Sequence, residues 1–134
     1  MKPITIVLFA TCALAGASAA SAKTAAPTPS APIVFFDIAG PDAAKLKQFY
    51  AANFGWDIDA ANGIKTPHLA GTLRQDPRET LIYLGVSDVD AALKKIVASG
   101  GAVAMPKMIV PKVATFAIFT DPEGNRMGLV ELPK

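Results

Sequence analysis

Two stretches of the chain repeat one order of apolar and polar positions. In the first, a β-rich run at residues 33–38 (IVFFDI) precedes a pattern with helical spacing that ends near Gly55. In the second, a run at residues 81–86 (LIYLGV) precedes another helical pattern, which stops at Gly100-Gly101. We therefore predict a strand followed by an amphipathic helix in each half of the chain.

A single offset of 46 residues aligns the two halves. It matches three pairs of positions: Phe35 with Leu81, Asp42 with Asp88, and Gly55 with Gly101. The two aspartates stand where helix N-caps are expected, and Gly55 suits a left-handed C-cap. Short strand candidates follow each helix, at residues 57–60, 64–69 and 72–75, and at residues 102–105, 113–119 and 126–132. The pattern predicts an α+β domain of two βαβββ units, which share one sheet system because one unit alone buries little.

The connections between these strands carry turn residues. Asn62-Gly63 and Ala70-Gly71 are predicted as turns within the first half. Residues 104–112 (AMPKMIVPK) contain two prolines and are predicted as a mobile loop.

The first 22 residues have the pattern of a signal peptide. Lys2 precedes an uncharged apolar run at residues 4–17, and Ala20-Ser21-Ala22 forms a small-x-small cleavage signal. We predict cleavage after Ala22 and a secreted or periplasmic protein, with a retained N-terminal anchor as the alternative. Residues 23–32 (KTAAPTPSAP) are predicted as a flexible linker, and residues 33–134 as the folded domain.

Composition narrows the classes of function. The whole chain carries 13 basic and 11 acidic residues, so its charge gives no case for binding nucleic acid or an anionic membrane. Its one cysteine, Cys12, lies in the signal segment, which excludes a disulfide within the mature chain. Sequence motifs for a serine nucleophile elbow, a phosphate loop or a dinucleotide site are absent.

Four segments, in this order and spacing, resemble the vicinal oxygen chelate superfamily, which includes glyoxalase I, bleomycin-resistance proteins and extradiol dioxygenases. They are residues 42–56 (DAAKLKQFYAANFGW), residues 83–92 (YLGVSDVDAA), Gly100-Gly101 and residues 121–131 (DPEGNRMGLVE). The resemblance implies that the two modules form a half-open, eight-stranded barrel around a cavity. It also implies a homodimer and, in most members, a divalent metal held by His and Glu side chains.

The metal-ligand positions of that family hold no suitable side chains here. They fall on Phe35 or its neighbour Phe36, on Leu81, on Gly128, and near Thr72 or Leu73. Zinc, iron and nickel bind imidazole, carboxylate or thiolate groups. We therefore expect no metal cofactor, and the fold without its usual metal site.

Strand alternation identifies other candidates for the cavity. Asp37 shares a face with Phe35, and Tyr83 shares a face with Leu81; the offset of 46 makes Asp37 and Tyr83 equivalent. If the modules pair as in the family, these two side chains meet. They are then either a polar pair that satisfies itself or an acid/base pair for catalysis.

The remaining candidates are ligand-binding residues. Phe35, Leu81 and Phe116 are predicted to line the cavity, with Arg126 at its rim facing an anionic ligand or simply solvent. His68, the one histidine, follows a proline on a predicted loop or edge strand, and a single histidine makes no transition-metal site without nearby carboxylates.

Three functions stay open from the sequence. The first is an exported module that binds a small, mostly apolar molecule without a metal. The second is a glyoxalase- or lyase-type enzyme that uses a divalent metal at unrecognised carboxylates or acid/base chemistry by Asp37 and Tyr83. The third is a dimeric interaction protein, for which no sequence feature argues directly.

Overall fold

The computed structural model describes residues 29–134, and the predicted signal segment and most of the predicted linker lie outside them. Each half of the described chain is a strand, a helix and three more strands. The first half contains β1 (Ile33–Gly40), α1 (Ala43–Phe54), β2 (Asp57–Ile58), β3 (Gly63–Lys65) and β4 (Ala70–Gln75). The second contains β5 (Glu79–Val86), α2 (Val89–Ala98), β6 (Ala102–Val110), β7 (Ala114–Thr120) and β8 (Arg126–Glu131). The predicted pair of βαβββ modules is confirmed.

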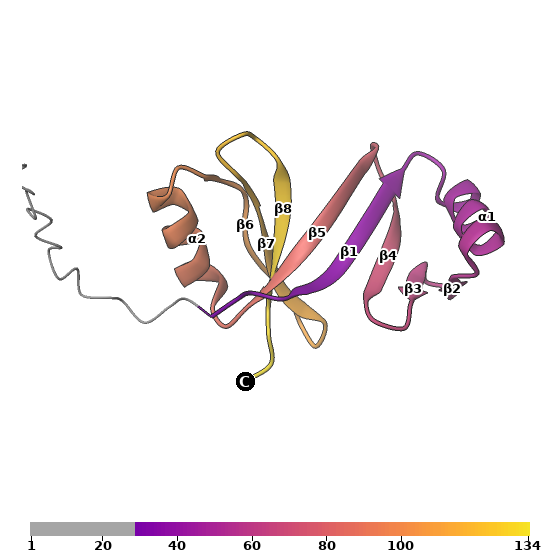
Figure 1. The fold of residues 1–134 in the computed structure, drawn as a ribbon, viewed down its shortest axis with the longest axis horizontal. Helices are drawn as coiled ribbons and strands as arrows, with labels where there is room; N and C mark the ends of the chain where they lie inside the picture. Colours follow the sequence, from indigo (N-terminus) through magenta and orange to yellow (C-terminus); the bar gives the residue numbers. More distant parts are fainter. Residues whose placement is uncertain (1–28) are drawn as a thin grey trace, which may run out of the picture.

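The two modules join through their first strands. All eight strands form one mixed sheet in the order β2-β3-β4-β1-β5-β8-β7-β6, in which β1 and β5 run antiparallel at the centre. Each of these strands pairs in parallel with the last strand of its own module, β1 with β4 and β5 with β8. Figure 1 shows the result: β1 and β5 run side by side in the middle, and α1 and α2 lie at opposite ends. The sheet is curved and does not close into a barrel.

Local capping chemistry sets the ends of the helices. The side chains of Asp42 and Asp88 each accept a hydrogen bond of 3.0 Å, from the backbone N–H of Lys45 and of Ala91 respectively. Gly55 follows α1 with φ of 64°, and its N–H donates to the carbonyl oxygen of Ala51. These contacts satisfy backbone groups that a helix end leaves unpaired. The predicted N-caps and the left-handed C-cap are therefore confirmed.

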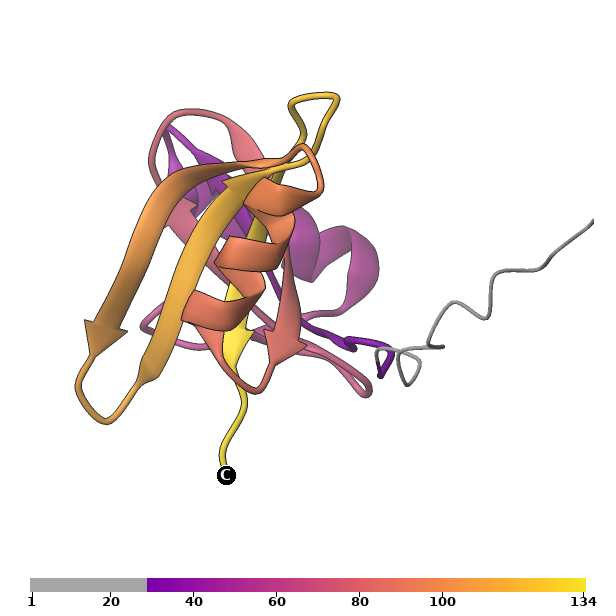
Figure 2. The ribbon, with the colours of Figure 1, turned by 90° about the vertical axis from the view of Figure 1, so that its left-hand side faces the viewer.

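Three apolar clusters stabilise the fold. One lies beneath α2, which packs across the second module (Figure 2), and includes Val89, Leu93 and Leu129. A second lies beneath α1 and is built on Ile58, Ile64 and Leu73. The third faces the opposite side of the sheet and is built on Leu81, Tyr83 and Ile118. The third cluster matters for function because neither α1 nor α2 covers that side.

In both modules an aromatic ring lies over a glycine on the neighbouring parallel strand. Phe36 on β1 is paired with Gly71 on β4, and Tyr83 on β5 is paired with Gly128 on β8. A Cβ atom at position 71 would lie 2.6 Å from the Phe36 ring, and one at position 128 would lie 2.1 Å from the Tyr83 ring. Both distances are far below van der Waals contact. Each ring can therefore lie in this position only because the residue beneath it is glycine, which has no side chain.

Two of the predicted connections are wrong. Ala70-Gly71 is part of β4, because Gly71 is the strand position on which the Phe36 ring rests. Residues 104–112 are mostly strand, because β6 continues to Val110. β6 tolerates Pro106 because it is an edge strand paired only with β7, and its register shifts on both sides of Met105.

The Gly128→Ala substitution tests whether the Tyr83 ring is held on the glycine. We expect it to lower the free energy of unfolding by about 1–3 kcal/mol, because the added methyl group forces the ring or β8 to move. Chemical denaturation measures this change. In a Tyr83→Ala background, Gly128→Ala should lower the free energy of unfolding by almost nothing further, because the ring is already gone.

Gly40→Ala is the matched control. Its Cβ would meet only the flexible side chain of Leu46, at 3.1 Å. Equal effects of the two alanine substitutions would show that the ring is not fixed over Gly128.

Candidate functional site

The uncovered side of the sheet contains a cavity of about 750 Å³. One part of its wall is apolar and comes from β1, β6, β7 and β8: Phe35, Met105, Phe116, Ile118 and Val130. The other part is polar and comes from β1, β4, β5 and β8: Asp37, Thr72, Arg74, Glu79, Tyr83 and Arg126. Strand alternation places these side chains on one face. The cavity is therefore amphipathic, as small-molecule sites commonly are.

Asp37 and Tyr83 meet where the two modules join. The Tyr83 hydroxyl donates a hydrogen bond of 2.8 Å to Oδ2 of Asp37, whose side chain is only 1% exposed. This confirms the contact that the offset of 46 predicts. Because Tyr83 comes from β5 and Asp37 from β1, the hydrogen bond joins the two modules directly.

Arg74 on β4 supplies the counter-charge for Asp37. Its Nη2 donates to Oδ1 of Asp37 at 3.2 Å. Its Nε lies 3.1 Å from Oδ2 but is not aligned to form a hydrogen bond. Both oxygens of the Asp37 carboxylate therefore have partners, which offsets the large cost of burying a charge.

The surroundings keep Tyr83 protonated and Arg74 charged. Burial raises the pKa of the Tyr83 phenol well above its ordinary value of 10.0, and the hydrogen bond to Asp37 and its negative charge act in the same direction. Burial by itself lowers the pKa of Arg74, but the hydrogen bond to Asp37 and its charge outweigh this effect and raise it. At neutral pH the phenol is thus a hydrogen-bond donor to Asp37 and not a base.

Glu79 extends this group of charges across the sheet. Its Oε2 lies 3.5 Å from Nη2 of Arg74, and its Oε1 accepts a hydrogen bond of 2.5 Å from Nε of Arg126. Arg74 and Glu79 are functional-site residues that the sequence pattern alone did not single out. Strand alternation could have placed both on the cavity face. Arg74 lies two residues after Thr72 on its strand, and Glu79 lies two residues before Leu81.

Of the other predicted site residues, some line the cavity and some do not. Phe35, Phe116 and Arg126 line the cavity. Leu81 is 1% exposed and belongs to the same apolar cluster as Tyr83 and Ile118, but it is not among the residues that line the cavity. His68 is exposed in the loop between β3 and β4, away from the cavity residues.

The residues at the family's metal-ligand positions do not fit a metal ion. Phe35 and Leu81 pack in an apolar cluster, and the Tyr83 ring occupies the space into which a side chain at Gly128 would project. The Thr72 hydroxyl donates to the carbonyl oxygen of Asn62 at 3.2 Å. Within residues 29–134, no group of three or more His, Cys, Asp or Glu side chains is placed to hold a metal.

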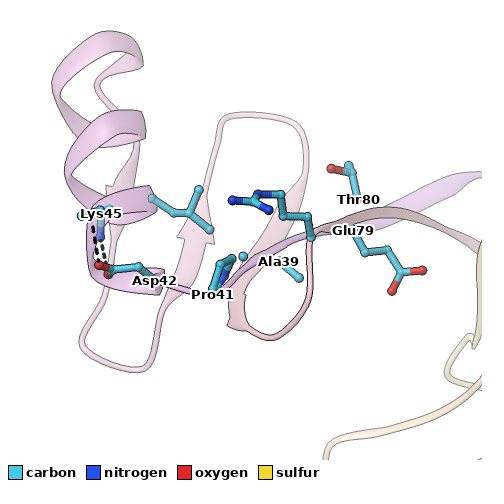
Figure 3. A pocket seen from close by; sticks show the side chains of 9 residues that line it. Ala39, Pro41, Asp42, Lys45, Glu79 and Thr80 are labelled. Carbon is cyan, nitrogen blue, oxygen red and sulfur yellow. Dashed lines mark hydrogen bonds and ion pairs between the residues drawn. The ribbon is translucent and has the colours of Figure 1, made fainter.

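A second hollow of about 580 Å³ lies beside the start of α1. Its lining includes Asp42, Lys45, Arg78 and Glu79. Figure 3 shows Asp42 and Lys45 together at the helix start, while the Glu79 side chain extends away from them. Asp42 is already engaged as the N-cap, which makes this hollow a weaker candidate than the cavity.

Tyr83→Phe tests the contribution of the phenol to stability. Removal of the hydroxyl leaves one oxygen of the buried Asp37 without its donor, so we expect a loss of about 1–3 kcal/mol in the free energy of unfolding. Denaturant titration at pH 7 measures it. Tyr50→Phe is the control, because no hydrogen bond of the Tyr50 hydroxyl is found among residues 29–134.

The pH dependence of stability provides a separate test. Above pH 10 the unfolded chain releases the Tyr83 proton while the folded chain retains it, so the contribution of Tyr83 to stability decreases as pH rises. The difference in stability between the wild type and Tyr83→Phe should therefore narrow between pH 10 and pH 11.5. A difference that stays constant over this range would contradict the raised pKa.

Comparison with known proteins agrees with this architecture. The chain is 30% identical over 111 residues to a Mycobacterium bovis protein named "Putative glyoxylase CFP32", an alignment that covers 69% of this chain and 42% of that protein. It is 28% identical over 124 residues to the anthracycline biosynthesis protein DauV of Streptomyces sp. strain C5, covering 72% and 45% respectively. The chain thus spans less than half the length of these curated relatives.

Solved structures share the fold. Methylmalonyl-CoA epimerase from Mycobacterium tuberculosis superposes with a TM-score of 0.60 at 13% identity, covering 82% of this chain and 93% of that one. A Streptomyces coelicolor methylmalonyl-CoA epimerase complex gives 0.56 at 18% identity, covering 78% and 100%. The model of one family, described as the Glyoxalase/Bleomycin resistance protein/Dioxygenase superfamily, matches residues 32–129. The chain belongs to this superfamily.

Proposed function

We propose that the protein binds a small, mostly apolar molecule in the cavity of its uncovered sheet face and does so without a transition metal. One observation carries the proposal: an apolar cluster, with the Tyr83 ring over Gly128, occupies the positions that hold metal ligands elsewhere in the family. The binding surface that remains is a wall of aromatic and aliphatic side chains.

The energetics of the wall support an apolar ligand. Burial of apolar surface contributes about 25 cal/mol per Å², so a ligand that buries 200 Å² against the wall would gain about 5 kcal/mol before the costs of association. The charges of Asp37, Arg74 and Glu79 are already paired with one another. Burial of apolar surface is therefore the main source of affinity.

The proposal also includes export of the protein and its assembly into a homodimer. Residues 1–22 have the features of a cleavable signal peptide, and cleavage after Ala22 would leave 112 residues. Among the described residues, no helix is both long enough and apolar enough to cross a bilayer. We further propose a homodimer, as expected from the superfamily resemblance.

A native mass spectrum of the mature protein, purified from the exported fraction without chelator, tests these statements together. We expect the mass of a dimer of the 112-residue chain, alone or with an organic adduct. Added Zn²⁺, Ni²⁺ or Fe²⁺ should leave the melting temperature unchanged, because the described residues contain no metal-binding group. A stoichiometric divalent metal in the spectrum would contradict the proposal.

Phe116→Glu tests the site of binding. It places a carboxylate on the apolar wall, so binding of an apolar ligand should be lost while the chain stays folded. Phe49→Glu is the matched control, since Phe49 lies on α1, is 54% exposed and does not line the cavity. Equal binding by both variants would place the ligand elsewhere.

The second candidate is a glyoxalase- or lyase-type enzyme. It is favoured by the direct contact between Asp37 and Tyr83 in the cavity wall and by similarity to a protein with a glyoxylase name. Tyr83 would then turn its single O–H from Asp37 to the substrate, and Asp37 would hold the phenol in place before this exchange. A glyoxalase assay with and without added divalent metal, on the wild type and Asp37→Asn, distinguishes this candidate from a binding module.

The third function, a dimeric interaction protein without a ligand, is disfavoured by the cavity on the uncovered face of the sheet.

A further inference from the structure

The charged side chains of the cavity differ in how many of their hydrogen-bonding groups already have a partner. The two oxygens of Asp37 and the two of Glu79 each have a guanidinium or hydroxyl partner. Each nitrogen of Arg74 lies within ion-pair distance of a carboxylate, Nη1 at 2.6 Å from Asp76 and the others against Asp37 and Glu79, although Nε forms no hydrogen bond. The two carboxylates therefore need no ligand to complete their hydrogen bonds, and the Nε of Arg74 is buried against Asp37.

Arg126 differs from these residues because part of its guanidinium group has no partner. Its Nε donates to Glu79, but no partner for its two terminal nitrogens is found within residues 29–134. Its side chain is 47% exposed and lines the cavity. A guanidinium has five N–H donors in a planar fork, so four remain for a group with two or more acceptor oxygens. Carboxylate and phosphate groups fit this fork.

The remaining acidic residue of the lining does not offer an equivalent site for a cation. Oε2 of Glu131 accepts a hydrogen bond of 3.3 Å from the backbone N–H of Val89, at the start of α2. Glu131 lies at the opposite end of β8 from Arg126. The hydrogen-bonding groups without a partner at the polar end of the cavity, among the described residues, are therefore the terminal N–H donors of Arg126.

We propose, building on the proposed binding function, that the ligand is an amphipathic anion whose carboxylate binds the terminal nitrogens of Arg126. The apolar tail lies against Phe35, Phe116 and Val130. Arg126, Gly128 and Val130 share one face of β8, and the distance along the strand from Arg126 to Val130 is about 13 Å. This length suits a medium-chain acid with its head at the polar end and its tail along the wall.

Isothermal titration calorimetry on the purified mature protein compares octanoate, octanol, octylamine and octyl phosphate. We expect octanoate to bind at least about 10-fold more tightly than octanol, as charge-assisted hydrogen bonds predict, with a preference that declines as salt is added. Tight binding of octyl phosphate would support the same anionic class and show that the head group is not restricted to carboxylate.

Variants locate the head group. Arg126→Gln should weaken octanoate binding about 10-fold and change octanol binding less than about 2-fold, whereas Arg126→Lys should lose part of the octanoate affinity because it keeps the charge but not the fork. Arg78→Gln is the matched control, since Arg78 is exposed and lines only the second hollow. Melting temperatures verify that each variant is folded.

The outcomes separate this inference from the proposed function. If octanol and octanoate bind wild type equally, or octylamine binds most tightly, the anionic ligand is excluded while the apolar cavity remains the binding site. If octanoate binds with unchanged affinity to Arg126→Gln, the assignment to Arg126 is overturned. If none of the four compounds binds, the proposed function fails as well.

Discussion

A carboxylate buried at the junction of the two modules is the constraint on which the uncovered face of the sheet depends. Asp37 is almost inaccessible, so its charge requires partners inside the protein. Tyr83 reaches it from the other module and Arg74 from the neighbouring strand. The antiparallel pairing of β1 with β5 brings these groups together, and their contacts in turn hold the two modules in one register. The charged end of the cavity is thus part of the structural framework.

Tyr83 connects that framework to the apolar wall. Its hydroxyl belongs to the buried charge cluster, and its ring packs against Phe35 and over Gly128. A side chain at position 128 and the ring of Tyr83 would compete for one volume. The phenol, the glycine and the absence of metal-binding side chains in this part of the fold therefore form a single arrangement. The cavity that results is lined by apolar side chains and by Arg126, whose Nε is paired with Glu79.

Much of the fold could be predicted because its signals are local. The caps at Asp42, Asp88 and Gly55 depend on residues within one helical turn, and each was assigned correctly. The two wrong connections depended on distant residues. Gly71 has turn chemistry in the sequence, but the ring of Phe36 requires a glycine at that strand position. Pro106 indicates a loop, but the edge of the sheet accommodates a proline without losing an essential hydrogen bond.

The sequence by itself determined the two βαβββ units, the faces of their strands and the equivalence of Asp37 with Tyr83, because strand alternation and internal duplication are properties of the chain alone. That these two side chains meet followed once the modules were taken to pair as in the family they resemble. Only the tertiary structure decided that Arg74 and Glu79 complete the charge cluster, that Leu81 is buried and does not line the cavity, and that the terminal nitrogens of Arg126 have no partner within residues 29–134. These outcomes depend on register between strands far apart in the chain, and alternation assigns a side chain to a face without specifying which neighbour it meets there.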